Sequence, residues 1–203
     1  MTGADRESRP DAEHRLIPPH GGYRKLRSFR TAQQVYDATV LFCNRFINPQ
    51  SRTRDQMVQA ARSGVQNIAE GSMAAATSRK TELKLTGVAR ASLEELLLDY
   101  EDFLRQRGLR IWPQDSAEAL AVRRRYQSDQ SDASERPDPS DPHGLKTADP
   151  ETAANTLLCL INQASFLLGR QMQTLEREFL EQGGFTERLY RERSRYRNSQ
   201  NPQ

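Results

Sequence analysis

Apolar residues recur three and four positions apart in four long stretches of the chain, which is the spacing of a helix that buries one face. These stretches are residues 28–47, 53–70, 79–107 and 150–182. In the first stretch, the predicted buried stripe consists of Phe29, Ala32, Tyr36, Val40, Cys43 and Ile47. No stretch of any length alternates apolar and polar residues as a half-buried strand does. The pattern therefore predicts an all-α fold.

Four long amphipathic helices with short first and second connections predict an antiparallel up-down four-helix bundle over residues 28–182. Residues 1–27 are polar and are broken by Pro and Gly, so we expect a flexible N-terminal arm. Residues 114–148 contain a short helical pattern and then a stretch rich in Ser, Asp and Pro, which predicts a flexible acidic insertion outside the core. Residues 183–203 form a basic tail, in which we expect one or two helical turns; both chain ends are expected to be disordered.

Capping residues mark several of the predicted helix ends. Thr53 and Gln56 have the spacing of a capping box at the start of the second helix, and Gly71 is expected to provide a left-handed cap at its end. Asp149 precedes Pro150 at the start of the fourth long helix, which combines a favourable N-cap with a proline in the first turn.

The second helix has a glycine on its apolar face. On a helical wheel this face consists of Met57, Ala60, Ala61, Gly64, Val65 and Ile68. A glycine inside a helix costs about 1 kcal/mol relative to alanine, so we expect Gly64 to permit close approach of another helix. Asn67 flanks this face and is expected to bond across it. Glu70 lies in the predicted last turn, where the helix dipole disfavours a carboxylate, so we expect a partner arginine from a neighbouring helix or from another subunit.

Composition and charge exclude several classes of protein. No apolar run approaches the roughly 18 residues of a membrane-spanning helix, and the first residues lack the apolar core of a secretory signal. Cys43 and Cys159 stand singly in apolar patterns, so we expect buried thiols in a reducing cytoplasm rather than a disulfide or a redox pair. The formal net charge of +3 permits a nucleic-acid partner without indicating one.

An enzyme is poorly supported by the sequence. His14, His20 and His143 lie in the predicted arm and insertion, and no phosphate loop or nucleophile motif occurs. The third helix carries a row of acids that lacks the Glu-x-x-His step of di-metal bundles. These acids are Glu94, Glu95, Asp99, Glu101 and Asp102. We expect them to form a solvated face or a docking surface for a neighbour's arginines, and we expect no metal, cofactor or small-molecule substrate.

Basic residues near the ends of the second helix, at the start of the third helix and in the tail are the candidate nucleic-acid-binding residues. They are Arg52, Arg54, Arg62, Arg79, Lys80, Lys84, Arg188, Arg191, Arg193, Arg195 and Arg197. Contacts from such residues to phosphates are largely independent of base sequence and depend strongly on salt. The alternative is that each cation is solvated or pairs with the acidic face of the third helix.

Two stretches resemble a known family. Residues 62–71, RSGVQNIAEG, and residues 92–96, SLEEL, match recurring blocks of the bacterial four-helix-bundle family of ribosomal-RNA intervening-sequence proteins. This family includes the accessory variability proteins of diversity-generating retroelements. The matching positions are Arg62, Ser63, Asn67, Ile68, Ala69, Glu70, Gly71, Ser92, Leu93, Glu95 and Leu96. The resemblance covers residues 23–112, and GGFTERLYRER at 183–193 resembles the suffix of the four-helix-bundle suffix branch.

The resemblance implies a helical bundle that assembles into a ring, with a pentamer as the best-known state. For the retroelement members it also implies a basic surface that binds nucleic acid and a reverse transcriptase. The candidate structural or interface residues are Gly64, Asn67, Glu70, Gly71, Ser92 and Glu95. The sequence thus predicts a homo-oligomeric accessory protein that binds RNA or DNA. The alternatives are a protein-interaction scaffold and, third, a membrane-surface protein, which the narrow apolar face of the tail disfavours.

Overall fold

The computed structural model describes residues 21–128, 141 and 143–200, and every regular element in this part of the chain is a helix. The predicted all-α class is therefore confirmed. The elements are the 3₁₀-helix η1 (Gly22–Lys25) and the α-helices α1 (Arg27–Phe46), α2 (Arg52–Ala74), α3 (Arg79–Gln106), α4 (Ala117–Ser128), α5 (Pro150–Gln182) and α6 (Phe185–Gln200). Most of the predicted N-terminal arm and much of the predicted acidic insertion lie outside the described residues.

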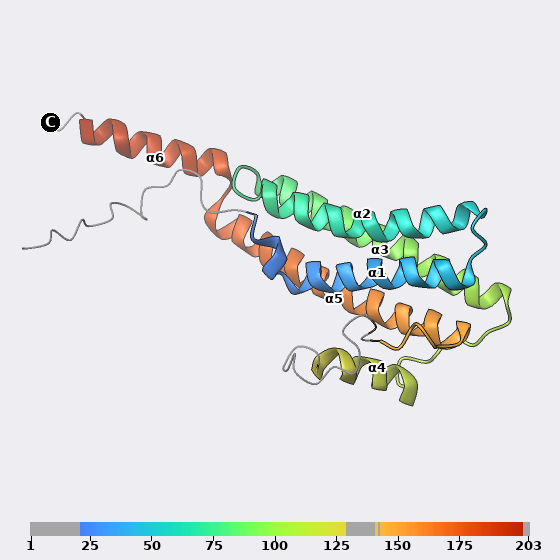
Figure 1. Cartoon of the computed structure of the whole chain (residues 1–203). Helices are drawn as coiled ribbons and strands as arrows, with labels where there is room; N and C mark the ends of the chain where they lie inside the picture. Colours follow the sequence, from blue (N-terminus) through green and yellow to red (C-terminus); the bar gives the residue numbers. More distant parts are fainter. Residues whose placement is uncertain (1–20, 129–140, 142, 201–203) are drawn as a thin grey trace, which may run out of the picture.

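The four long helices α1, α2, α3 and α5 lie side by side (Figure 1). The contacting pairs are α1 with α2, α2 with α3, α3 with α5, and α5 with α1. Followed along the chain in Figure 1, successive long helices run in opposite directions. Their inward faces share one apolar core, to which α1 gives Val35 and Phe42, α3 gives Leu93 and Tyr100, and α5 gives Leu157.

An aromatic cluster around Phe42 joins the last turns of α1 and α3 within this core. The Phe42 ring centroid lies 4.9 Å from that of Tyr100 and 4.8 Å from that of Phe103, both in edge-to-face geometry. The Tyr100 hydroxyl donates a hydrogen bond to Thr39 Oγ1 at 3.1 Å, and burial raises the pKa of Tyr100 well above its ordinary value. The predicted stripe of the first helix was wrong in part, because Thr39 and Phe42 are buried in place of Tyr36 and its neighbour Val40.

Gly64 lies where α2 and α3 approach each other closely. It is buried, and a Cβ atom added to it would come within 3.0 Å of Leu93 Cδ2. Beside it, the hydroxyl oxygens of Ser63 and Ser92 lie 3.0 Å apart and join the two helices. Asn67 donates to the carbonyl oxygen and the hydroxyl of Ser63 within its own helix, at 2.9 and 3.1 Å. The polar bond across this seam therefore comes from the two serines, and not from Asn67 as predicted.

The starts of the helices follow local capping rules, with one correction. Ser51, not Thr53, is the N-cap of α2: its hydroxyl accepts a hydrogen bond from the Thr53 N–H at 3.3 Å. The predicted capping box at Thr53 was therefore placed two residues too late. Ser78 caps α3 by accepting from Thr81, and Asp149 caps α5 in the predicted way, with Pro150 in the first turn.

The end of α2 also differs from the prediction. The helix continues past Gly71 to Ala74, so Gly71 is not a left-handed cap. Gly71 is instead a second point of close approach, because a Cβ atom there would lie 3.3 Å from the carbonyl oxygen of Glu82 on α3. Glu70 lies one turn earlier in the helix than predicted. It is exposed and forms no ion pair with the described residues, so no arginine from a neighbouring helix of this chain is its partner there.

Two segments outside the four long helices pack against the core. In η1, the Tyr23 ring lies 4.8 Å from that of Phe29 on α1, edge to face. In α4, Val122 and Tyr126 are buried, and the Tyr126 hydroxyl lies 2.5 Å from Thr31 Oγ1 on α1. The first part of the predicted insertion is therefore attached to the helical body, because its apolar residues cover the outer side of α1 and α5.

Candidate nucleic-acid interface

The basic tail forms a longer helix than the one or two turns predicted. Gly183, with φ at 73°, ends α5 in the left-handed region that glycine adopts without strain. The Glu187 carboxylate then accepts a hydrogen bond from the Gly184 N–H at 2.7 Å and caps the start of α6. The helix continues for 16 residues, to Gln200.

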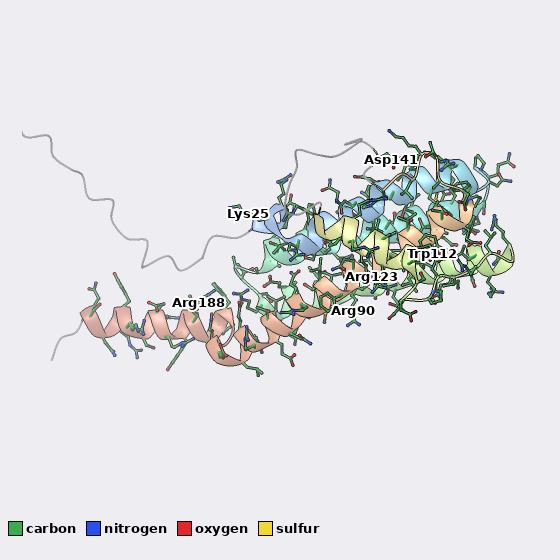
Figure 2. The ribbon with its side chains drawn as sticks, turned by 90° about the horizontal axis from the view of Figure 1, so that it is seen from below. Lys25, Arg90, Trp112, Arg123, Asp141 and Arg188 are labelled. Atoms are coloured by element: carbon green, nitrogen blue, oxygen red, sulfur yellow. The ribbon has the colours of Figure 1, made fainter. Side chains whose placement is uncertain are left out.

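Helix α6 projects beyond the other helices (Figure 1) and has no buried residue. Figure 2 shows side chains on all sides of it, with Arg188 at the end nearest the other helices. The Arg188 guanidinium donates to the carbonyl oxygen of Ala76, in the connection between α2 and α3, at 3.3 Å. It also lies 5.7 Å from the Phe185 ring centroid. These contacts attach the first turn of α6 and leave the later turns exposed.

Three of the five α6 arginines have partners within the protein. Arg188, Arg191 and Arg195 share a sector of about 60° on the helical wheel, at 100° per residue. Arg191 donates to the Gln182 carbonyl oxygen at 2.7 Å, and Arg195 forms an ion pair with Glu192 at 2.9 Å. The guanidinium groups in this sector of α6 thus have hydrogen-bond or ion-pair partners within the chain itself.

The other two arginines, Arg193 and Arg197, form no hydrogen bond or ion pair with the described residues. They share a sector of about 120° with Tyr190 and Tyr196, on the side of the helix away from Arg191. Tyr190 is 72% exposed and Tyr196 is 68% exposed, and neither ring contacts another ring in the described structure. We call these four residues the Tyr/Arg face of α6.

The start of α3 lies at the end of the body to which α6 is attached (Figure 1). Arg79 already has partners within the protein, since its guanidinium forms ion pairs with Glu82 at 2.9 Å and with Glu178 of α5 at 3.1 Å. Burial raises the pKa of Glu82, and the adjacent Arg79 opposes that rise. Lys80 and Lys84, four residues apart on one side of α3, are exposed and form no ion pair with the described residues.

The remaining candidate cations lie elsewhere. Arg52 and Arg54 stand at the start of α2, and the 23 residues of this helix place them about 35 Å from the start of α3. Arg54 donates to Asn44 Oδ1 at 2.7 Å, and Arg62 is exposed in the middle of α2. The predicted basic set therefore does not converge on one end of the molecule. Its α6 members and Lys80 and Lys84 gather at one end, because the last turn of α5 returns the chain there.

The acidic row of α3 borders a polar groove between α2 and α3. The groove encloses about 500 Å³, because three of its lining side chains are small. The lining residues are Arg52, Asp55, Gln56, Gln59, Ala60, Ser63, Ser92 and Glu95. Burial, with Glu95 and Asp102 nearby, raises the pKa of Asp99. Asp102 pairs with Arg105 of the same helix at 2.6 Å, so the acidic row is partly neutralised locally.

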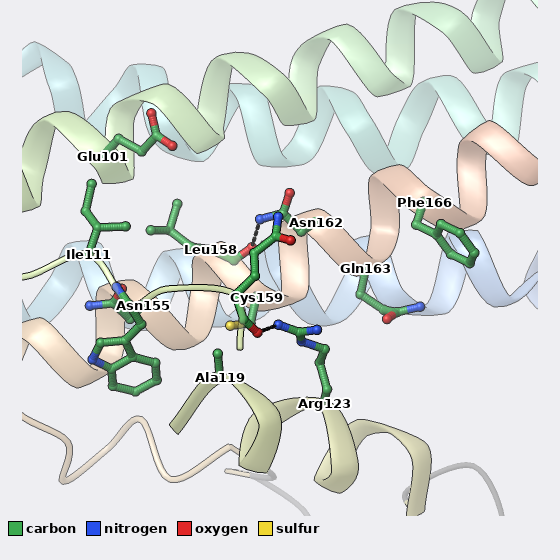
Figure 3. A pocket seen from close by; sticks show the side chains of 12 residues that line it. Glu101, Ile111, Ala119, Arg123, Asn155, Leu158, Cys159, Asn162, Gln163 and Phe166 are labelled. Atoms are coloured by element: carbon green, nitrogen blue, oxygen red, sulfur yellow. Dashed lines mark hydrogen bonds between the residues drawn. The ribbon is translucent and has the colours of Figure 1, made fainter. Parts of the chain in front are cut away.

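A second cavity, of about 520 Å³, lies between α4, α5 and the segment before α4 (Figure 3). Its polar side chains bond largely to its own walls. Asn155 accepts from the Trp112 N–H and donates to the Arg110 carbonyl oxygen, each at 2.8 Å, and Arg123 donates to the carbonyl oxygen of Gln114. No candidate site was predicted here from the sequence, and the arrangement assigns no chemistry to the cavity.

Cys43 and Cys159 are both free thiols, so they do not form a disulfide. Cys43 is fully buried, and burial raises its pKa to about 11. Cys159 is half-buried and lines the cavity beside α4. Burial raises its pKa as well, and the nearby Arg123 opposes the rise. Neither thiol has the lowered pKa of a nucleophilic cysteine.

Within the described ranges, no group of three or more His, Cys, Asp or Glu side chains is arranged to hold a metal ion. In the same part of the chain, no helix combines the length and apolar content that crossing a bilayer requires. Comparisons of the chain with protein-family models, with curated proteins and with solved structures gave no match. The resemblance to the intervening-sequence family therefore stays a prediction from the sequence.

Proposed function

We propose that the chain is a non-enzymatic, homo-oligomeric accessory protein that binds nucleic acid through α6 and the start of α3. The observation that carries the proposal is the Tyr/Arg face of α6, where Arg193 and Arg197 are exposed and have no hydrogen-bond or ion-pair partner among the described residues. Lys80 and Lys84 add two more cations at the same end of the body, and neither forms an ion pair within the described part of the chain. Together these four residues would form the phosphate-binding surface.

We also propose that α1, α2, α3 and α5 form an antiparallel up-down four-helix bundle. Support comes from the cyclic order of the helix contacts and from the alternating helix directions in Figure 1. In this description α4 belongs to a packed connection between the third and fourth bundle helices. The basic suffix then starts where the bundle ends, at Gly183, which places α6 outside the core and free for a partner.

Charge and helix stability both favour an anionic partner for α6. An isolated helix of 16 residues without tertiary packing is only marginally stable in water. Helix α6 also contains five arginines and only two glutamates, so its positive charges repel one another along the helix. Phosphate groups would remove this repulsion, and the released counterions would make the affinity depend strongly on salt.

The test is fluorescence anisotropy of a labelled single-stranded RNA titrated with the full chain at several salt concentrations. We expect binding at low salt that weakens steeply as salt rises, with the logarithm of the affinity falling by about 0.7 per neutralised phosphate for each tenfold rise in salt. The double variant Arg193→Ala, Arg197→Ala is expected to bind more weakly and to have a salt slope smaller by about 1.4.

The matched control is Arg52→Ala, Arg62→Ala. It removes the same two positive charges from exposed positions on α2, away from the proposed surface. If the control weakens binding as much as the α6 variant does, only net charge matters and the proposed surface is wrong. Absence of RNA and DNA binding by the native chain at low salt would overturn the nucleic-acid function itself.

A second candidate function is a protein-interaction scaffold, which the outer face of α3 favours. Leu98 is 55% exposed there, beside the acidic row and the polar groove between α2 and α3. Multi-angle light scattering of the native chain and of Leu98→Glu tests this function and the proposed oligomer. A native oligomer that does not bind RNA, and that dissociates in the variant, would support the scaffold. A monomeric native chain would exclude a ring in both proposals.

A further inference from the structure

We infer that α6 binds single-stranded rather than duplex nucleic acid, by stacking bases on Tyr190 and Tyr196 between phosphate contacts from Arg193 and Arg197. The inference rests on the proposed nucleic-acid function and names the class of nucleic acid that it recognises. It is carried by the placement of two exposed rings among the two unpaired arginines on one side of the helix.

The order of the four side chains fits an alternation of stacking and phosphate contacts. Tyr190, Arg193 and Tyr196 follow one another at three-residue steps, so each is a surface neighbour of the next. Arg197 lies four residues after Arg193 on the same side. Tyr190 and Tyr196 are about 9 Å apart along the helix axis, and Arg193 lies midway between them. A strand that crosses the helix here meets an aromatic face, a cation and a second aromatic face.

Neither of the two rings has a ring contact or a hydrogen-bonded hydroxyl within the part of the chain that the structure describes. Tyr23, Tyr100 and Tyr126 each have a ring contact or a hydrogen-bonded hydroxyl inside the described structure. The Tyr190 and Tyr196 side chains have neither, and more than two thirds of each residue is exposed to solvent. Their apolar faces are therefore available for a partner at no cost to the fold.

Stacking on exposed rings selects for unpaired bases. In a duplex, each base already stacks on its neighbours, and the deep, narrow major groove of A-form RNA excludes side chains from the base edges. In a single strand, the faces of the bases are free, and every base offers a π-face whatever its sequence. The arginines alone would bind both forms through phosphates, so the tyrosines are the residues that distinguish them.

The experiment compares one labelled sequence as single-stranded RNA, single-stranded DNA and duplex, titrated with the full chain and three variants. The variants are Tyr190→Ala, Tyr196→Ala; the ring-preserving Tyr190→Phe, Tyr196→Phe; and Leu180→Ala, which removes an apolar side chain that is 77% exposed at the end of α5. The native chain is expected to prefer both single strands over the duplex. The alanine variant is expected to lose at least about fivefold in single-strand affinity per tyrosine.

The salt slope separates stacking from charge. Since no charge is removed, the alanine variant should keep the native salt slope, and the phenylalanine and Leu180 variants should keep the native affinity. The inference would be overturned if the native chain bound single strand and duplex equally well, or if the alanine variant bound as the native chain does. The proposed function would still hold in that case if the variant Arg193→Ala, Arg197→Ala bound nucleic acid more weakly. An altered oligomeric state of the alanine variant by light scattering would instead assign the rings to self-association and overturn the inference. Failure of the native chain to bind any nucleic acid would overturn both proposals.

Discussion

Gly64 of α2 faces Leu93 of α3 so closely that an added methyl group would lie 3.0 Å from Leu93 Cδ2. Leu93 is fully buried and has little space to move. We therefore expect Gly64→Val to lower the free energy of unfolding by about 1–3 kcal/mol through overpacking, measured by urea denaturation. Gly169→Ala on α5 is the matched control, because nothing lies within 4 Å of its added Cβ. It should gain up to about 1 kcal/mol from helix propensity. Equal stability of the two variants would show that α2 and α3 are farther apart than described.

The hydroxyl groups of Tyr126 and Thr31 join α4 to α1 at 2.5 Å. Tyr126→Phe keeps the buried ring and removes this bond, so we expect a loss of about 0.5–1.5 kcal/mol in the docking of α4. Hydrogen exchange should show faster exchange in α4 and unchanged exchange in the middle of α3. Unchanged protection of α4 in the variant would mean that its apolar residues alone hold it in place.

Glu82 makes the stability depend on pH in an unusual direction for a carboxylate. Burial raises its pKa above the ordinary 4.5. The folded protein therefore binds this proton more tightly than the unfolded chain, and the resulting stabilisation is lost as pH rises from the ordinary carboxyl pKa through the raised one. Unfolding free energies of the native chain and of Glu82→Gln across this window should diverge, with the glutamine variant gaining relative to the native chain as pH rises. A difference that stays constant with pH would contradict the raised pKa.

The two cysteines should react at very different rates with a thiol reagent. Cys43 is fully buried and its pKa is raised to about 11, so only about one molecule in a thousand carries the reactive thiolate at pH 8. Cys159 is half-buried at the cavity beside α4 and should react first in the native protein. Mass spectrometry of the labelled peptides measures both rates. Cys159→Ser should abolish the faster phase, and faster labelling of Cys43 would show that the core opens more readily than its packing indicates.

The aromatic core shows that helical spacing alone does not determine which side of α1 is buried. The spacing in the first helix allowed two neighbouring stripes, one through Tyr36 and one through Phe42. Both satisfy helical periodicity, so the wheel alone does not separate them. Helix α1 buries the Phe42 stripe because that side faces Tyr100 and Phe103 of α3, which lie about sixty residues away in the chain.

The candidate interface likewise depends on contacts that the sequence does not reveal. Each basic residue was visible in the sequence, but its availability depends on partners from other elements. Arg79 is held by Glu178 of α5 and Arg188 by the carbonyl oxygen of Ala76, whereas Arg193 and Arg197 have no such partner in residues 21–128, 141 and 143–200. A list of cations therefore could not separate the paired from the unpaired arginines.

The sequence by itself determined the all-α class, the approximate positions of the long helices and the capped start of α5, because periodicity and caps such as Asp149 act within a few residues. Only the tertiary structure decided that Gly71 continues α2, that α4 packs on the core, and that two arginines and two tyrosines of α6 have no side-chain hydrogen bond, ion pair or ring contact with the described residues. These outcomes depend on which distant segments meet, and close packing fixes that choice through contacts between residues far apart in the chain.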